Sequence, residues 1–273
     1  MEHATDRPYL VGAVVYHEKV RDIWAAFGDW FAAHGFPIAV TYYDDYETQV
    51  EALLAGRIDT GWNTNLAYAH TLTRSNGHAA PIAMRDTDLG WRSHLVVRAD
   101  HPAQTVADLR GATVGFGDAD SPQAHLLPVH ALRRDGLDPA RDVRATRLDR
   151  DLGKHGDTGG AELAQLARVR AGALDACVLS SVVLDAVTRL GDADALRVVW
   201  TSPPFNHCNF TVLTPEGAGR HDRFAALLCS MDASDPKLCE PMQLEMVNAW
   251  IPPQTDGYTD LLDALAAGPI VVG

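Results

Sequence analysis

The chain has 273 residues, 47% of them hydrophobic and 22% charged, which is the composition of a globular protein able to bury one large core or two smaller ones. Its formal net charge of −13 argues against general binding to nucleic acid, and no apolar run reaches the roughly 18 residues of a membrane-spanning helix. A small anionic ligand is compatible with this charge, because a local site can be positive on a negative protein.

The N-terminal segment and the cysteines bear on the cellular compartment. Residues 1–8 contain no basic stretch followed by an apolar one, so no secretory signal is recognised and a cytoplasmic location is expected. A periplasmic location, with an ABC permease as partner, applies only if a signal has been removed. The four cysteines lack Cys-x-x-Cys spacing, so free thiols are expected, and a disulfide between Cys229 and Cys239 would require export.

Strands and helices alternate through the first third of the chain. Short apolar runs predict buried strands at residues 11–15, 38–43 and 58–62. Helical spacing of apolar side chains predicts helices at residues 20–34, 47–54 and 64–72. Strands that alternate with helices usually pair in parallel, so the pattern predicts an α/β sheet.

A second region of similar plan occupies the middle of the chain. Apolar strands are predicted at residues 90–97 and 113–116, with a helix at residues 126–132. An Ala-Gly stop, an Asp, a strand and a small polar residue follow one another at residues 55–65 and again at residues 171–181. Two units of similar plan favour a two-lobed protein over one continuous sheet.

The last quarter of the chain is expected to return to the first lobe. A strand is predicted at residues 210–213, and three helices are predicted at residues 221–229, 236–248 and 258–265. The predicted division is residues 1–97 with 203–273 as the first lobe and residues 98–202 as the second, joined by two hinge crossings.

Small polar residues precede two of the predicted helices. Thr64 or Asn65, and Ser180 or Ser181, are plausible N-caps. If the lobes face each other, such helix N-termini line one cleft and attract small anions. The alternative is that these residues only cap their helices.

Taken in order, these segments resemble the phosphate/phosphonate-type group of type II periplasmic binding proteins, from residue 11 to residue 266. The resemblance is carried by short pieces in a fixed order: Asp45-Tyr46, Ala55-Gly56 with Ile58-Asp59, the strand at 90–97, Asp108-Leu109 with Gly111, Phe116-Gly117-Asp118 with Asp120-Ser121, Trp200 with Ser202-Pro203-Pro204, Met231-Asp232, and Tyr258 with Leu261. It implies an α/β fold of two lobes with a ligand cleft between them, and binding of a small anionic metabolite.

The chain departs from this family's pattern at the expected anion site. The family has an aromatic-His-Ser run before the first crossing, whereas Arg92 stands in the place of the His here. The family's Ser-Thr-Ser anion cradle is reduced to Ser121, followed by Pro122 and Gln123, and a proline has no N–H to donate. A His of the second lobe has a counterpart in His155. These departures weaken the expectation of phosphate or phosphonate as the ligand.

The candidate ligand-binding residues combine the polar turns with two aromatic side chains. They are Tyr16, Asn63, Thr64, Asn65, Trp91, Ser93, Ser121, Gln123, His155 and Ser180.

Four residues suggest catalysis as an alternative to binding. His17 and Glu18 could form a general acid/base pair, and Cys208 beside His207 could be a nucleophile. Neighbouring residues of a strand point to opposite faces, so His207 need not serve Cys208. The fold is also used by cytoplasmic enzymes, including menaquinone-pathway lyases and thiamine pyrimidine synthases, so a lyase, isomerase or hydrolase remains an alternative.

A metal site is a further alternative. His17, His207 and Cys208 are ligand types suited to zinc or iron, although no His-x-x-x-His or Cys-x-x-Cys spacing supports one. The sequence contains no phosphate-binding loop and no nucleophile elbow, so no organic cofactor is predicted.

Overall fold

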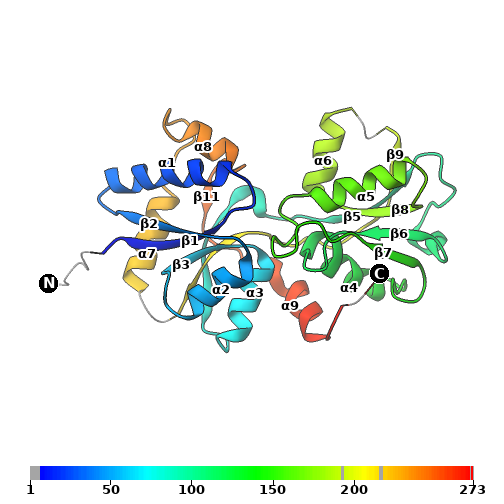
Figure 1. The fold of residues 1–273 in the computed structure, drawn as a ribbon, viewed down its shortest axis with the longest axis horizontal. Coiled ribbons are helices and arrows are strands. Elements are labelled where there is room, and N and C mark those ends of the chain that lie inside the picture. The colour runs from blue at the N-terminus through cyan, green and yellow to red at the C-terminus, as the bar shows by residue number, and fades with distance from the viewer. Residues whose placement is uncertain (1–6, 192–193, 215–217, 271, 273) are drawn as a thin grey trace. The chain divides into compact units, whose positions relative to one another are not determined.

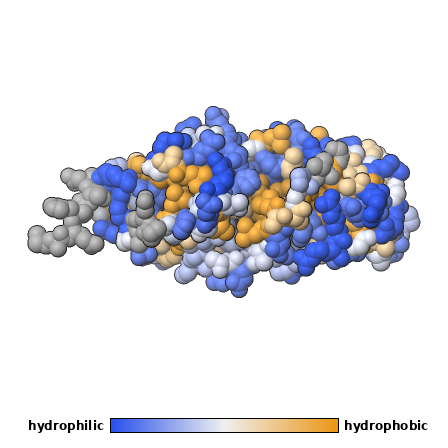
Figure 2. All heavy atoms as spheres, turned by 90° about the horizontal axis from the view of Figure 1, so that it is seen from below, coloured by the Kyte–Doolittle hydropathy of each residue, from blue (hydrophilic) through white to orange (hydrophobic). Residues whose placement is uncertain are grey.

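The structure is a computed structural model that describes residues 7–191, 194–214, 218–270 and 272. The chain forms two compact units, Met1–Leu89 with His207–Thr255, and Gly90–Asn206 with Asp256–Gly273. Within the described residues, no helix combines the length and the apolar character needed to cross a membrane. Hydrophilic side chains predominate on the face drawn in Figure 2, with smaller hydrophobic areas between them.

Unit 1 is built on a six-stranded mixed sheet of order β11-β4-β10-β3-β1-β2 (Figure 1). Its strands are β1 (Tyr9–Val14), β2 (Ile38–Tyr43), β3 (Thr60–Asn63), β4 (Ala79–Arg85), β10 (Asn209–Leu213) and β11 (Trp250–Ile251). The alternation of strands and helices correctly predicts that β1 pairs in parallel with β2 and β3. The later strand β10 inserts antiparallel between β3 and β4.

Helices cover both faces of this sheet. They are α1 (Lys19–Ala33), α2 (Tyr46–Leu54), α3 (Asn65–Arg74), α7 (Ala218–Leu228), α8 (Cys239–Leu244) and the 3₁₀ turn η1 (Asp86–Asp88). The apolar stripe of α1 packs with α7, α8 and the sheet into an aromatic core that includes Trp24, Phe31, Phe210 and Phe224. α2 and α3 lie on the opposite face (Figure 1). α8 ends earlier than the predicted helix at 236–248, because Met246 takes a left-handed conformation with φ 55°.

Unit 2 is built on a five-stranded mixed sheet of order β7-β6-β8-β5-β9. Its strands are β5 (Ser93–Arg98), β6 (Thr113–Phe116), β7 (Arg144–Arg147), β8 (Ala176–Ser180) and β9 (Leu196–Thr201). Its helices are η2 (Val106–Leu109), the π-turn η3 (Pro122–Leu126), α4 (Leu127–Arg134), α5 (Gly160–Arg170), α6 (Ser181–Arg189), η4 (Asp256–Tyr258) and α9 (Thr259–Ala266). Because side chains alternate along β8, Cys177 and Leu179 face α5 and α6, whereas Ala176 and Val178 face α4.

The unit boundaries differ from the predicted ones. Strand β5 was expected in the first lobe, but it pairs with β8 and β9 and therefore belongs to unit 2. The chain also changes unit a third time, after Thr255, so that α9 joins unit 2 rather than unit 1. There Leu261 is buried and Asp260 forms an ion pair with Arg134 of α4. Local sequence patterns predict that a segment is a strand or a helix, but they do not show which distant segment it pairs or packs with, and this contact determines the unit to which it belongs.

Candidate functional site

The turn between β6 and α4 is the best organised of the predicted ligand-binding segments. Ser121 is its N-cap, and the Ser121 Oγ accepts a hydrogen bond from the Ala124 N–H at 3.1 Å. The Ser121 carbonyl accepts from His125 N–H and Leu126 N–H. A Cβ at Gly117 would lie only 2.6 Å from the Ala124 Cβ, so this close turn requires glycine there.

The loop at residues 149–160 is tied to this turn by two aspartates. The Asp118 Oδ1 accepts from the N–H groups of Arg150 and Asp151, at 2.5 and 2.8 Å. The Asp120 Oδ2 accepts from the Gly153 N–H at 2.6 Å. These aspartates belong to the segment that carries the family resemblance, but the sequence did not predict them as site residues.

The same loop carries His155 to the turn. The Gln123 Nε2 donates to the His155 carbonyl at 3.3 Å. A Cβ at Gly156 would lie closer than 3.0 Å to Ser121 Oγ and Gln123 Nε2, so the loop backbone packs directly against the turn. The predicted residues Ser121, Gln123 and His155 thus lie together in unit 2.

Two further predicted residues meet across the sheet of unit 2. Ser93 of β5 and Ser180 of β8 are direct antiparallel partners. The Ser93 Oγ donates to the Gln123 carbonyl at 2.6 Å, which joins the sheet to the turn. The Ser180 Oγ accepts from the Val183 N–H, which identifies Ser180 rather than Ser181 as the cap of α6.

Glu162 is a candidate site residue that sequence reasoning missed. The Ser180 N–H and Oγ both donate to its Oε2, at 2.6 and 2.9 Å. Burial raises the pKa of the Glu162 carboxyl to about 7, although the bonds from Ser180 oppose this shift. An acidic residue in the first turn of a helix is common, so nothing in the local sequence distinguished it. We call Ser93, Ser121, Gln123, His155, Glu162 and Ser180 the unit 2 cradle.

Two buried oxygens of the unit 2 cradle have no donor within the described part of the chain. They are the Oε1 atoms of Gln123 and Glu162, both of which belong to side chains only 2% exposed. Leaving a buried acceptor unsatisfied costs about 1–3 kcal/mol. The cradle is therefore suited to a molecule that donates hydrogen bonds to these two atoms.

Trp91 lies in unit 2 with the cradle. It is buried, and it forms an isolated bridge with Phe205, whose N–H donates to the Trp91 carbonyl at 2.8 Å. The adjoining Arg92 donates from Nη1 to the Ser202 carbonyl. The position where the family has a His is thus taken by a side chain that fastens two segments of unit 2.

The predicted residues of unit 1 lie at or just after the carboxyl ends of β1 and β3, two strands that pair in parallel. Thr64 is buried and caps α3 by accepting from the Ala67 N–H, as the pattern of small polar residues predicts. The neighbouring Asn63 accepts from the Gln49 Nε2 at 2.7 Å, and Asn65 is buried in the first turn of α3. Tyr16 is half-buried against the core of unit 1.

His17 and Glu18 lie at the exposed start of α1. The His17 Nδ1 accepts from the Lys19 N–H at 3.2 Å, and Glu18 occupies the N-cap position without a capping side-chain bond. His17 is not part of the group of possible metal ligands that the described residues form, so the predicted set of His17, His207 and Cys208 is not assembled.

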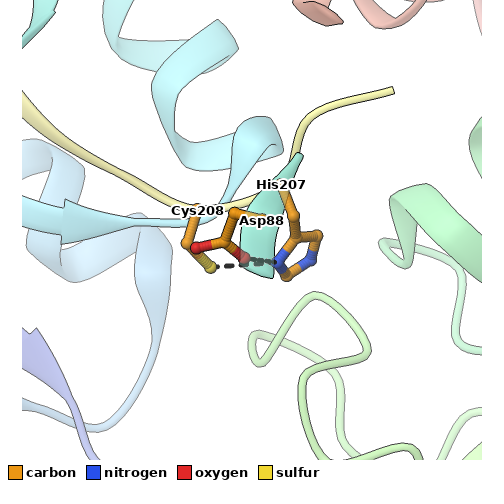
Figure 3. Close-up of side chains that lie close together, drawn as sticks. All are labelled: Asp88, His207 and Cys208. Carbon is orange, nitrogen blue, oxygen red and sulfur yellow. Dashed lines mark hydrogen bonds and ion pairs between the residues drawn. The ribbon is translucent and has the colours of Figure 1, made fainter. Parts of the chain in front are cut away.

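His207 and Cys208 instead meet Asp88, and all three side chains are buried (Figure 3). The Cys208 Sγ lies 3.0 Å from the His207 Nδ1, and the Asp88 Oδ1 lies 3.6 Å from the same nitrogen. His207 and Cys208 precede β10, so the alternation of side chains that argued against their contact does not apply to them. Asp88 was not predicted, because His207 and Cys208 are more than a hundred residues away from it in the sequence.

Arg85 holds this group against the core of unit 1. Its Nε and Nη2 donate to the two oxygens of Asp88, at 2.7 and 2.8 Å, and its Nη1 donates to the Glu245 carbonyl at 2.7 Å. Burial by itself would raise the pKa of Asp88, but the charge and hydrogen bonds of Arg85 hold it below its ordinary value. Burial raises the pKa of Glu245 to about 7, and the Trp62 Nε1 donates to this carboxyl.

Comparison with solved structures identifies the fold. PhnD1 from Prochlorococcus marinus, in complex with methylphosphonate, superposes with a TM-score of 0.71 at 16% identity, covering 95% of this chain and 97% of that one. XAC2383 from Xanthomonas citri, bound to ATP, gives a TM-score of 0.73 at 21% identity over the same shares. The expected α/β fold of type II periplasmic binding proteins is therefore confirmed.

Comparison of sequences identifies the family. The phosphonates-binding periplasmic protein of Escherichia coli (strain K12) is 24% identical over 135 residues, or 47% of this chain and 40% of that protein, so the match spans less than half of that relative. A family model described as "ABC transporter, phosphonate, periplasmic substrate-binding protein" matches residues 12–258. The chain belongs to this family of phosphonate-binding substrate-binding proteins of ABC transporters.

Proposed function

We propose that this protein binds a small phosphonate-like molecule that also carries a hydrogen-bond donor such as an amino group, and that the unit 2 cradle supplies its polar contacts. The observation that carries the proposal is the pair of buried oxygens, Gln123 Oε1 and Glu162 Oε1, that have no donor among the described residues. Family membership supports the phosphonate-like class, and methylphosphonate is bound by the similar PhnD1.

The charges of the cradle favour a zwitterion over a dianion. None of its six residues is Lys or Arg, and Glu162 adds a carboxyl group. The hydroxyl hydrogen of Ser121 can still be donated while its oxygen accepts from Ala124, but Pro122 contributes no N–H. The phosphonate oxygens of an aminophosphonate would accept hydrogen bonds from hydroxyl groups such as that of Ser121, and its ammonium group would donate to Gln123 Oε1 and Glu162 Oε1. These hydrogen bonds would offset the cost of removing both the ligand and the protein groups from water.

A matched pair of ligands tests this proposal. We expect isothermal titration calorimetry to show at least tenfold tighter binding of aminomethylphosphonate than of methylphosphonate, because only the former donates to Glu162. Glu162→Gln removes the carboxylate charge and should abolish most of the difference. Glu240→Gln, on the exposed side of α8, is the control that should preserve it. Equal affinities for the two ligands in the wild type, or no binding of either at millimolar concentration, would rule out the proposed ligand class.

Partner and compartment follow from the proposed function. A substrate-binding protein of this family is expected to deliver its ligand to an ABC permease, which requires export. The cytoplasmic location expected from residues 1–8 stays a prediction, and cell fractionation with a specific antibody decides between the two compartments.

Catalysis has less support than binding. Of the four catalytic candidates, only His207 and Cys208 are brought into contact, whereas His17 and Glu18 are exposed at the start of α1. A lyase, isomerase or hydrolase activity therefore remains the second hypothesis.

A further inference from the structure

Three ligand-type side chains converge in the interior of unit 1, and the proposed binding function uses none of them. Asp88, His207 and Cys208 are each at most 2% exposed. Each offers one ligand atom, a carboxylate oxygen, a ring nitrogen or the sulfur, and these three atoms all lie within 4.8 Å of one another. Among the described residues, no other group of three His, Cys, Asp or Glu side chains comes together in this way.

The arrangement of this group differs from a nucleophilic relay. In a relay the imidazole serves the nucleophile with one ring nitrogen and the carboxylate with the other. Here the Cys208 Sγ and the Asp88 Oδ1 approach the same nitrogen, Nδ1 of His207, at 3.0 and 3.6 Å (Figure 3). Because sulfur and oxygen both approach one nitrogen, the group lacks the order of a proton relay, and its three close ligand atoms instead resemble a set of metal ligands.

Two of the three distances between the ligand atoms are near those expected around a tetrahedral zinc ion. Zinc binds sulfur at about 2.3 Å, imidazole nitrogen at about 2.0 Å and carboxylate oxygen at about 2.1 Å. Tetrahedral angles then separate sulfur from nitrogen by about 3.5 Å, and nitrogen from oxygen by about 3.4 Å. The observed 3.0 and 3.6 Å require shifts of only a few tenths of an ångström.

The surrounding charges can accommodate a divalent cation. The guanidinium of Arg85 contacts two carboxyl groups, those of Asp88 and Glu245, at 2.7 and 3.4 Å. With both carboxyls and the Cys208 thiol ionised, the formal charge of these four side chains is −2. A dipositive ion would bring this buried cluster to neutrality, which removes the main electrostatic cost of burying it.

The geometry points to a zinc-type metal site formed by Asp88, His207 and Cys208. Thiolate and imidazole ligands select a borderline-soft divalent ion over magnesium or calcium. Metal binding would release the thiol proton of Cys208 and replace it with a sulfur–metal bond. Three protein ligands leave the fourth tetrahedral position for water or for an atom of a bound molecule.

Cobalt(II) absorption tests this assignment on the full-length protein, prepared under reducing, chelator-free conditions. Co²⁺ should produce a thiolate-to-metal charge-transfer band in the near ultraviolet and visible bands typical of tetrahedral coordination, and Zn²⁺ should displace both. Cys208→Ser should abolish the charge-transfer band, and His207→Gln should weaken Co²⁺ binding at least tenfold. Cys239→Ser, which changes an exposed cysteine, is the matched control and should leave the spectrum unchanged.

Two results would overturn the metal site. One is the absence of a charge-transfer band in folded wild-type protein at millimolar Co²⁺, and the other is a band that survives Cys208→Ser but disappears in Cys239→Ser. Circular dichroism establishes that each variant is folded. The Tm of the wild type provides a second measurement: Zn²⁺ should raise it in the wild type and in Cys239→Ser, and should leave it unchanged in Cys208→Ser.

Discussion

Glu162 is the buried residue on which the proposed ligand preference and the pH dependence of stability both depend. Its carboxyl group is packed at the start of α5, where its hydrogen-bond donors among the described residues are the N–H and Oγ of Ser180, both on one oxygen. Burial disfavours the charged form, which raises the pKa to about 7. A ligand ammonium group would favour the charged form instead, so ligand binding should release the proton that Glu162 holds near neutral pH.

The raised pKa of Glu162 predicts how stability varies with pH. The folded state retains this proton up to about pH 7, whereas the unfolded state loses it near the ordinary value of 4.5. The favourable contribution is therefore complete below about pH 4.5 and is lost as the pH rises through 7. Glu162→Gln does not titrate. Relative to this variant, the wild type should lose up to about 3 kcal/mol of unfolding free energy over that range.

Urea denaturation of both proteins at several pH values between 4.5 and 8 measures this difference. Because both proteins share every other titrating group, the difference between their unfolding free energies isolates Glu162. A difference that stays constant with pH would show that Glu162 is already ionised in the folded protein.

At the scale of elements, the loop at residues 149–160 completes the unit 2 cradle. It has no helix or strand of its own before α5, and the carboxylates of Asp118 and Asp120 hold its backbone. Gly156, at φ +79°, packs against the turn, where a side chain has no room. The loop therefore positions His155 by backbone contacts rather than by a hydrophobic core of its own.

Two glycines of unit 2 test the close contact of this loop. Gly136 and Gly156 both have positive φ, but only Gly156 would direct a Cβ into other atoms. Gly136→Ala should cost about 1–2 kcal/mol for the left-handed backbone alone. Gly156→Ala should cost a further 1–3 kcal/mol, roughly the penalty of overpacking, and should weaken aminomethylphosphonate binding. Chemical denaturation and calorimetry measure both effects, and equal losses in the two variants would contradict the close packing.

The sequence predicted what local patterns record. Short apolar runs located most strands, and small polar residues before helices identified the caps Thr64 and Ser180. Asp88 and Glu162 escaped prediction, because an acidic residue in a turn or a first helical turn looks ordinary until its distant partners are known. The alternation of side chains along a strand argued against a contact between His207 and Cys208. Both residues precede β10, where this alternation does not apply, and their side chains are in contact.

At the scale of the whole molecule, the chain changes unit three times, after Leu89, after Asn206 and after Thr255. Two of these points lie beside residues of the proposed metal site, because Asp88 and His207 each stand next to a crossing. After the third change of unit, α9 packs against α4, the helix that follows the turn of the unit 2 cradle. Each unit thus completes its own polar cluster from segments far apart in the sequence, which explains why neither cluster was visible as a motif.

Hydrogen–deuterium exchange with and without saturating aminomethylphosphonate tests the central claim, that the unit 2 cradle binds the ligand. Peptides that cover residues 117–126 and 150–163 should exchange more slowly with ligand, because the turn and the loop would be fixed by the same bound molecule. Saturating ligand that leaves both peptides unchanged would contradict the claim and place the ligand elsewhere.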